Sequence, residues 1–350
     1  MSTRIQILSG FDAKAPAAIL ISTPKVRLLL DAGGPLQADQ PCDWFAGIEA
    51  DALILSHDHV DHIGSVGQLP SMQVYATAPV ATQLPGGCLH RLLPAQGDID
   101  IGGIRLRCGR AGHSLGGVWL HLELAGGLFY SGDFSLESQL YPFDVPPPAA
   151  TALLDASYGS YQTPQQHCLE TLQALFAEPC LFPVPPSGRA IEMALWFDAL
   201  GLTSWSMDNA CYQALLTLLQ QPAGLFAPGT YARLQQLAMQ YRGFDDQAQL
   251  LLAADPEGLS GEAGRLIADP DCRHQVIYTG YLPPAAQAAV EEGRARFARW
   301  NVHPRQQDVL WLAEQLQARR VMPLFTPLQR AHWQAQLGER LWLQHDFILE

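Results

Sequence analysis

Short apolar segments separated by Gly, Pro and Asp dominate the first 160 residues of the chain. The segments with the length and apolar content of β-strands are Ile5–Leu8, Ala18–Ser22, Val26–Leu30, Ala52–Leu55, Val74–Ala76, Ile104–Cys108, Val118–Leu124, Leu128–Tyr130 and Leu153–Asp155. Several of them are joined by gaps of hairpin length, and helical spacing is rare between them. The pattern predicts a layered and largely antiparallel sheet domain.

The spacing of apolar residues changes after Tyr161 to the period of amphipathic helices. Helices are predicted over residues 164–177, 189–200, 209–219, 247–254, 284–300, 307–319 and 328–337. Strands are predicted at Leu181–Val184, Gln275–Thr279 and Val321–Phe325. The pattern therefore predicts a sheet domain built from residues 1–161 and 301–350, with an α/β domain at 162–300 inserted between its two parts.

The composition is that of a globular protein with an ample core, because 48% of the 350 residues are hydrophobic. The chain contains no apolar run of the length that crosses a bilayer, so no membrane association is expected. The start of the chain lacks the basic and apolar regions of a secretory signal. The seven cysteines are scattered without a Cys-x-x-Cys pair. Reduced thiols and a cytoplasmic location are therefore expected.

The charge of the chain restricts how it can bind nucleic acid. A formal net charge of −13 argues against strong non-specific binding, which depends on cationic contacts to phosphates. A local basic groove is still compatible with this charge. The arginines gathered in one stretch near the C-terminus are Arg294, Arg296, Arg299, Arg305, Arg319, Arg320 and Arg330.

The strongest chemical signal follows the predicted strand at Ala52–Leu55. There His57, His59, Asp61 and His62 fall within six residues. In an extended turn, residues two apart face the same side, so His57 and His59 are expected to face one ion. Asp61 and His62 come next and are expected to face a neighbouring ion. Imidazole and carboxylate groups suit Zn²⁺, and also Mn²⁺ or iron.

Two later turns carry further candidate ligands. His113 lies in a glycine-rich segment between two predicted strands, and Asp133 follows Ser131-Gly132 at the end of another. Either residue alone would be a weak signal, since a lone His is usually structural and Asp is common in turns. Their order and spacing after the first motif favour a shared metal site.

These motifs together resemble the metallo-β-lactamase superfamily. The apolar segment Leu28–Leu30 followed by Asp31-Ala32-Gly33 resembles that family's early Leu-Leu-Asp-x-Gly turn. The resemblance implies a four-layer αββα fold and two divalent ions, Zn²⁺ or Mn²⁺. It also implies the roles of six ligands: His57, His59 and His113 for the first ion, Asp61 and His62 for the second, and Asp133 as the bridge.

Other segments resemble the β-CASP nuclease branch of this superfamily. They are Tyr130–Phe134, Leu153–Gly159, Pro183–Glu192 and Val276–Tyr281. The second ends its predicted strand at Asp155, and the third contains the Gly-Arg-x-x-Glu sequence that opens a helix in that branch. The resemblance implies that residues 162–300 form the smaller, β-CASP-like α/β domain and that the substrate is nucleic acid.

The chain departs from the β-CASP pattern in two places. The segment Asn301–Arg305 retains a histidine, His303, but lacks the branch's Asp companion two residues later. The last predicted strand, continued to Pro327, has no His-Gly, whose His completes the second metal site in RNA-processing members. DNA-acting relatives such as cross-link-repair nucleases also tend to lack it. The expectation is therefore a DNA exonuclease with a role in DNA repair, DNA favoured over RNA, and a weaker second metal site.

The resemblance also implies catalytic roles. A metal-activated hydroxide, oriented by Asp61, would attack phosphorus. His303 would donate a proton to the leaving oxygen, and Asp155 would hold its ring. The residues expected to bind a substrate phosphate at the start of a helix are Ser187, Gly188 and Arg189.

Three alternatives stay open from the sequence. An RNA-processing nuclease would use the same ligands. A hydrolase of a small ester, lactone or thioester is favoured by the acidic charge, whereas Gly188-Arg189 and the inserted domain argue against it. A catalytically weak partner subunit would explain the missing histidine, but the six intact ligands argue against that interpretation.

Overall fold

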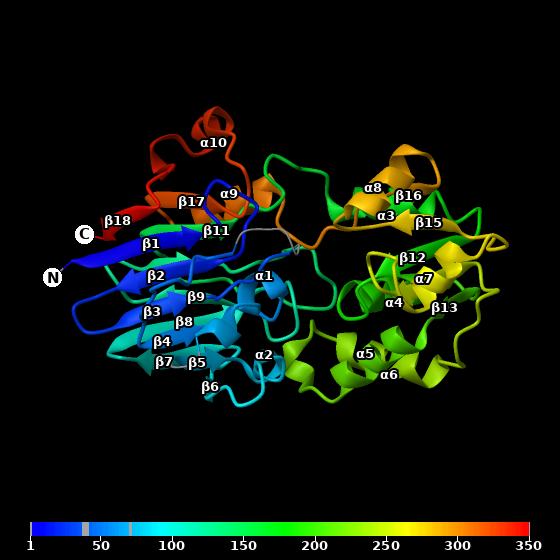
Figure 1. Ribbon diagram of the computed structural model, residues 1–350, viewed down its shortest axis with the longest axis horizontal. Coiled ribbons are helices and arrows are strands. Elements are labelled where there is room, and N and C mark those ends of the chain that lie inside the picture. The colour runs from blue at the N-terminus through cyan, green and yellow to red at the C-terminus, as the bar shows by residue number, and fades with distance from the viewer. Residues whose placement is uncertain (1, 37–41, 70–71, 350) are drawn as a thin grey trace. The chain divides into compact units, whose positions relative to one another are not determined.

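A computed structural model describes residues 2–36, 42–69 and 72–349 of the chain (Figure 1). It divides into two compact units. The first contains Met1–Leu136, Tyr141–Gln162 and Val302–Glu350. The second contains Glu137–Leu140 and Thr163–Asn301. Each unit is described by itself.

Two sheets form the centre of the first unit (Figure 1). The seven-stranded sheet has the order β18 (Asp346–Leu349), β1 (Thr3–Ser9), β2 (Ala18–Ser22), β3 (Arg27–Leu30), β4 (Ala52–Ile54), β5 (Gln73–Ala76) and β6 (His90–Leu92). The six-stranded sheet has the order β17 (Arg320–Leu324), β11 (Thr151–Asp155), β10 (Leu128–Tyr130), β9 (Val118–Leu122), β8 (Ile104–Arg110) and β7 (Gly97–Ile101).

Both sheets are mixed, so the prediction of a largely antiparallel domain was wrong in part. Strands β3 to β6 run parallel to one another, as do β10, β11 and β17. Parallel neighbours need crossover connections. Those between β4 and β6 contain helices too short to leave a periodic signal: α1 (Val60–Ile63), η1 (Val66–Gln68) and α2 (Ala78–Ala81).

The apolar core lies between the two sheets, and helices cover their outer faces. Alternation along β3 shows how the sequence sorts side chains, because Leu28 and Leu30 join the central cluster while Leu29 joins the outer one. Short helical segments cover the seven-stranded sheet through Val66 and Val80. The outer face of the six-stranded sheet packs against α9 (Gln306–Gln315) and α10 (Arg330–Leu337). These four layers confirm the predicted αββα fold.

A parallel five-stranded sheet organises the second unit, in the order β13 (Trp205–Met207), β14 (Leu250–Ala254), β12 (Cys180–Val184), β15 (Gln275–Tyr278) and β16 (Ala295–Phe297). Its helices are α3 (Gln165–Gln173), α4 (Arg189–Ala199), α5 (Asn209–Leu219), η2 (Ala223–Leu225), α6 (Thr230–Gln240), α7 (Gly261–Ala268) and α8 (Pro284–Glu291).

Two helix predictions in this unit were wrong. Residues 250–254 form strand β14, whose first four residues are buried. A strand flanked by neighbours on both sides of a parallel sheet has no polar face, so its continuous apolar run can resemble a buried helix. The predicted helix at 284–300 ends at Glu291, and β16 follows it. Helices α6 and α7 were not predicted.

Glu192 on α4 ties several segments of the second unit together. This buried carboxylate accepts hydrogen bonds from the hydroxyl of Ser138, the backbone N–H groups of Gln139 and Leu140, and Nε1 of Trp300. Burial raises the pKa of Glu192, and the four donors act in the opposite direction. The Glu of the Gly-Arg-x-x-Glu sequence thereby holds Glu137–Leu140 within this unit.

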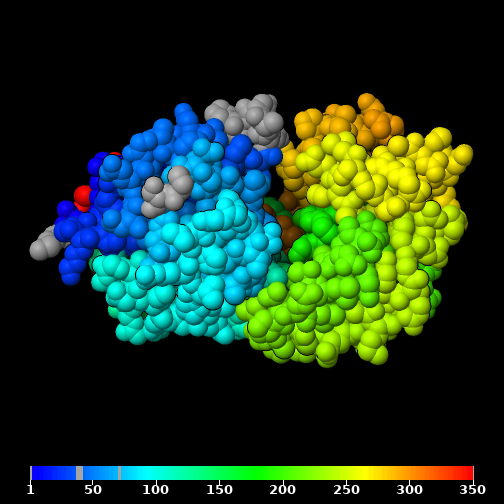
Figure 2. All heavy atoms as spheres, turned by 60° about the horizontal axis from the view of Figure 1, so that its bottom comes forward, coloured from blue at the N-terminus to red at the C-terminus, as the bar shows by residue number. Residues whose placement is uncertain are grey.

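The edge strand β6 is exposed at all three of its residues. Its segment lies within the cyan surface of the first unit in Figure 2. Among the residues that the structure describes, none of the helices combines the length and apolar character that a bilayer crossing requires. The seven cysteines form no disulfide.

Candidate metal centre

The His57–His62 motif begins where β4 ends. His59 has an extended backbone and precedes α1, which starts at Val60, so Asp61 and His62 occupy the first turn of this helix. Gly33 allows this turn to approach the β3 loop, because a Cβ atom at Gly33 would lie 2.0 Å from the carbonyl oxygen of Asp61. The segment after β4 and the helical turn together supply four of the candidate ligands.

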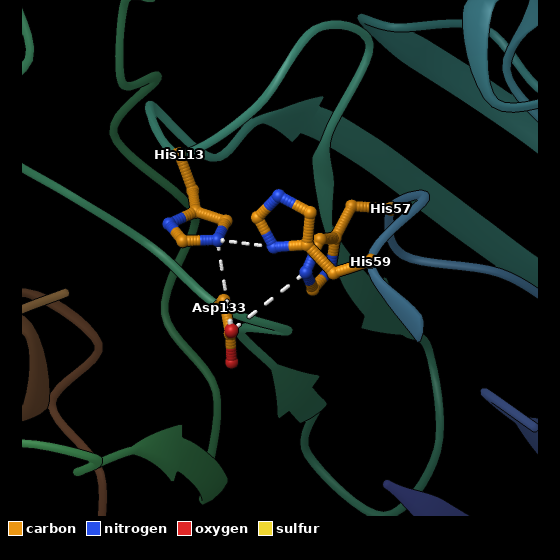
Figure 3. Close-up of side chains that lie close together, drawn as sticks. All are labelled: His57, His59, His113 and Asp133. Carbon is orange, nitrogen blue, oxygen red and sulfur yellow. Dashed lines mark hydrogen bonds and ion pairs between the residues drawn. The ribbon is translucent and has the colours of Figure 1, made fainter. Parts of the chain in front are cut away.

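The first group of candidate ligands consists of His57, His59, His113 and Asp133, whose ligand atoms all lie within 4.8 Å of one another (Figure 3). Nδ1 of His59 lies 3.0 Å from Nε2 of His113. The Oδ2 atom of Asp133 lies 3.6 Å from Nε2 of His113 and 3.7 Å from Nε2 of His57. Three imidazoles and a carboxylate form a donor set that suits Zn²⁺ or Mn²⁺.

Hydrogen bonds from the other ring nitrogens orient two of these imidazoles. His113 donates from Nδ1 to the carbonyl oxygen of Val302 at 2.8 Å, and Nδ1 of His57 lies 3.0 Å from Oγ of Ser56. Both rings thereby direct Nε2 into the group. Nε2 of His57 is buried without a hydrogen-bond partner, which would be costly unless an ion binds there. The residues present therefore fit a bound divalent cation.

The second group shares Asp133 and adds Asp61 and His62. The Oδ1 atom of Asp133 lies 3.3 Å from Nε2 of His62, whereas its Oδ2 atom faces the first group. One carboxylate thus presents an oxygen to each group, which is the arrangement expected of a bridging ligand. All six predicted ligands are brought together at this edge.

Asp31 orients a ligand of each group through hydrogen bonds, a role that was not predicted from the sequence. Its side chain accepts hydrogen bonds from Ser56, from Nδ1 of His62 at 2.7 Å and from the hydroxyl of Tyr130 at 2.6 Å. Ser56 in turn contacts Nδ1 of His57. Asp31 therefore orients His62 directly and His57 through Ser56. The Leu-Leu-Asp-x-Gly turn contained the signal, but its spacing did not reveal these partners.

A third group places His303 beside the two others. Nδ1 of His303 lies 3.0 Å from Oδ2 of Asp155 and 3.5 Å from Oδ2 of Asp133. Asp155 is fully buried at the end of β11. Because a carboxylate only accepts, Nδ1 carries the proton in this pair, and Nε2 of His303 is available for a second proton. The structure thus brings His303, the predicted proton donor, to Asp155, the residue predicted to hold its ring.

Burial and neighbouring charges set different proton affinities for the candidate ligands. Burial lowers the pKa of His57 and of His113, and the adjacent imidazoles lower both further. Burial acts the same way on His62, but Asp133 and Asp31 overcome it and raise the pKa of His62 well above its usual range. Burial alone would raise the pKa of Asp133, yet His62 and His303 hold it well below its usual range.

These shifts predict that acidification releases the second ion before the first. A raised pKa lets protons compete for His62 at a higher pH, whereas lowered pKa values keep His57 and His113 neutral and able to bind metal at a lower pH. Metal content after dialysis at stepwise lower pH should fall from two ions to one and then to none. A single step that removes both ions would contradict this order.

Phe325 lies where the sequence lacks the His of the RNA-processing members. It follows β17, and its ring packs edge-on against His62 with the ring centroids 5.4 Å apart. An aromatic ring therefore contacts the second group where an imidazole would add a ligand. We predict that Phe325→His increases the affinity for the second ion by about tenfold or more. Changing a residue that hydrogen-bonds to a metal ligand alters metal affinity by a similar factor. Competition with a chelator measures the affinity, with Phe325→Leu as the control that adds no donor.

The predicted phosphate-binding residues belong to the second unit. Ser187 is exposed, Gly188 has a positive φ of 71° immediately before α4, and Arg189 starts the helix. The Arg189 guanidinium lies against the backbone of Gly280, where a Cβ atom would come within 2.1 Å of Nη1. The Gly188-Arg189 and Gly280-Tyr281 motifs are thereby in contact. Binding of substrate by these residues stays a prediction.

Comparison with known proteins confirms the predicted superfamily. Residues 12–175 match the sequence model of the metallo-beta-lactamase superfamily. The transcription termination factor FttA of Methanothermobacter thermautotrophicus is 26% identical over 246 residues, which are 55% of this chain and 39% of that protein. The cleavage and polyadenylation specificity factor 73 of Drosophila melanogaster is 23% identical over 252 residues, 59% of this chain and 36% of that protein. The matches thus span less than half the length of these relatives.

A solved structure extends the likeness over the whole chain. The crystal structure of a protein of unknown function from Enterococcus faecalis V583 aligns with a TM-score of 0.64 at 12% identity. The alignment covers 100% of both chains. At this level of identity the similarity concerns the fold alone.

Proposed function

Because residues 12–175 match the sequence model of the metallo-beta-lactamase superfamily, we propose that this protein is a metal-dependent phosphodiesterase that cleaves RNA. The observation that carries the proposal is the His303–Asp155 pair, with Nδ1 of His303 3.5 Å from the shared ligand Asp133. Hydrolysis of a phosphodiester requires a proton on the leaving oxygen, and a second imidazole proton beside the metal ligands can supply it.

The candidate ligands prepare the site for attack on phosphorus. A divalent ion bound by these residues would act as a Lewis acid that activates water and stabilises negative charge on the phosphate. Asp61, half-buried on the first turn of α1, would accept a hydrogen bond from the attacking water and orient it. Asp133 would hold the two ligand groups in register through its two oxygens.

His303 and Asp155 would complete the reaction on the leaving-group side. Asp155 fixes the ring by accepting the Nδ1 proton, so Nε2 would carry the proton given to the leaving oxygen. The hydroxyl of Tyr158 accepts a hydrogen bond from the backbone N–H of Val302, the residue preceding His303. The ring centroids of Tyr158 and His303 lie 5.3 Å apart. The short Val302–His303 segment is therefore held both by its backbone and by its side chain.

The choice of RNA corrects the expectation of DNA. The comparisons support a metal-dependent nuclease but not a DNA substrate or a DNA repair role, because the related proteins are named for transcription termination and for cleavage and polyadenylation. Loss of the last-strand histidine is therefore a property of the second metal site rather than a marker of DNA as substrate. Exonucleolytic cleavage stays a prediction.

The second unit has the organisation expected of the substrate-binding part. We propose that its parallel sheet and α4 constitute the β-CASP-like domain predicted at 162–300, and that Ser187, Gly188 and Arg189 contact substrate phosphates. A reducing, cytoplasmic location accords with the seven free cysteines.

The test is a cleavage assay with matched RNA and DNA. Single strands of the same sequence, labelled at the 5′ or 3′ end, are incubated with the purified protein and Zn²⁺ or Mn²⁺. Metal-dependent cleavage of RNA, lost in Asp61→Ala, is expected, and the two labels distinguish shortening from an end from internal cuts. Preferential cleavage of DNA would overturn the choice of substrate. Inactivity on both strands with two bound ions would overturn the proposed nuclease activity.

A further inference from the structure

A cavity of about 390 Å³ lies in the first unit at the beginning of strands β11 and β17. Thr151 starts β11 and lines this cavity, whereas Asp155 ends the same strand in the candidate metal centre. Four residue steps along a parallel strand span roughly 13 Å, so the cavity and the metal centre are separated by the length of the strand. They share no residue, and the nuclease proposal makes no use of the cavity.

Two adjacent arginines give this cavity its chemistry. Arg319 and Arg320 both line it, and neither has a carboxylate within ion-pair distance among the described residues. Arg91 of the same unit also lacks such a partner within the described ranges, but it stands alone, whereas Arg319 and Arg320 line one cavity together. The arginines of the same unit that do pair with a carboxylate are Arg4, Arg27, Arg105, Arg107, Arg110, Arg305, Arg330 and Arg340.

Both guanidinium groups are placed by their surroundings. The group of Arg320 lies over the indole of Trp342, 4.8 Å from the ring centroid, a cation–π contact. The group of Arg319 reaches the turn before β10, where a Cβ atom at Gly126 would lie 3.9 Å from its Nη2 atom. The backbone N–H groups of both arginines donate to the carbonyl oxygen of Ala150. Both positive side chains therefore belong to the lining of one cavity.

The indole of Trp342 belongs to the cavity lining and supports the guanidinium group of Arg320. Its Nε1 atom is buried and has no hydrogen-bond acceptor among the described residues. Glu339 is the only carboxylate that lines the cavity in the described part of the chain. The lining therefore offers two guanidinium groups against a single acid.

We propose that this cavity binds a phosphate group, carried by a nucleotide or by a nucleic-acid strand. Guanidinium forks match the geometry of phosphate oxygens, and the volume lies in the range of small-molecule sites and exceeds what inorganic phosphate alone would fill. The ligand would occupy the edge of the first unit opposite the metal centre. Its phosphate lies between Arg319 and Arg320.

Binding is measured by calorimetry on the full chain in EDTA, so that no metal ion in the candidate centre can hold a phosphate. The probes are inorganic phosphate, AMP and a ten-nucleotide single-stranded RNA. Arg319→Ala is compared with Arg91→Ala, which removes the same charge from another exposed arginine of the first unit with no described ion-pair partner. Arg320→Lys retains the charge but loses the fork.

At least one probe should bind the wild-type chain, and Arg319→Ala should weaken it by about tenfold or more while Arg91→Ala leaves it unchanged. Arg320→Lys should also weaken it. Binding of AMP identifies a free nucleotide as the source of the phosphate, and binding of RNA alone identifies a strand. The proposal is overturned if no probe binds, or if the Arg319 and Arg91 variants behave alike. Because the assay contains no metal, either result is independent of nuclease activity.

Discussion

Replacing Asp133 with asparagine should remove both metal ions and lower RNA cleavage by at least about a thousandfold, since ions in such centres supply several kcal/mol of transition-state stabilisation. Asp133 is the one residue common to all three candidate groups among the described residues. Its two oxygens face different groups, with Oδ1 toward His62 and Oδ2 toward His57 and His113. Asparagine has a single carbonyl oxygen and no charge, so it cannot serve both groups.

Metal content and cleavage rate are measured on the same preparation of Asp133→Asn. The matched control is Asp58→Asn, which makes the same chemical change inside the histidine motif at a residue outside the three groups. Asp58→Asn should retain both ions and most of the activity. Two tightly bound ions in Asp133→Asn would show that Asp133 does not bridge them. Equal losses in both variants would show that neither effect is specific to the shared ligand.

Replacing His303 with alanine should lower RNA cleavage by roughly a hundredfold to ten-thousandfold without changing the metal content, which is the range for loss of a general acid. Nδ1 of His303 bonds to the fully buried Asp155, and only 16% of the side chain is exposed. Asp155→Asn should have a similar effect. Asparagine carries no charge to stabilise a doubly protonated ring, and an amide N–H that donates to Nδ1 excludes a proton from that atom, so the imidazolium that acts as the acid would not form.

The leaving group distinguishes a proton donor from a residue that only supports the fold. A p-nitrophenyl phosphodiester needs no proton on its leaving oxygen, so His303→Ala should cleave it at nearly the wild-type rate. The exposed His167 provides the control substitution, and His167→Ala should leave both rates unchanged. Equal losses on RNA and on the activated ester would contradict the acid role. Loss of an ion in His303→Ala would instead identify His303 as a ligand.

Much of the fold follows from local patterns in the sequence. Strands β2, β3 and β10 were predicted to within a residue of their bounds because apolar runs between turn residues encode them directly. Strand β14 was mistaken for a helix because Leu250–Leu252 is apolar on both faces and carries no period. The parallel pairing of β3 to β6 was also missed, since it depends on crossovers rather than on hairpin gaps.

The candidate ligands could be selected from the sequence because their chemistry is concentrated in it. Four of them lie within six residues, and the spacing between His57 and His59 fixes their common direction in an extended segment. The roles of Asp31 and Phe325 could not be predicted in this way. Both residues contact His62 although they are distant from it in the sequence. Asp31 precedes His62 by 31 residues, and Phe325 lies in the C-terminal part of the chain.

The sequence by itself determined which chemical groups are present and in what order: the ligand types, the apolar strands that deliver them and the change to α/β pattern after residue 161. Only the tertiary structure decided which of these groups meet. It brings His303 to Asp155, which is 148 positions away in the sequence. It also joins Tyr130 to Asp31, the residue that orients the ligand His62, and forms a cavity at Arg319 and Arg320. The reason is physical, because spacing along the chain constrains neighbours within a few residues, whereas contacts across the two sheets are fixed by packing of the whole core.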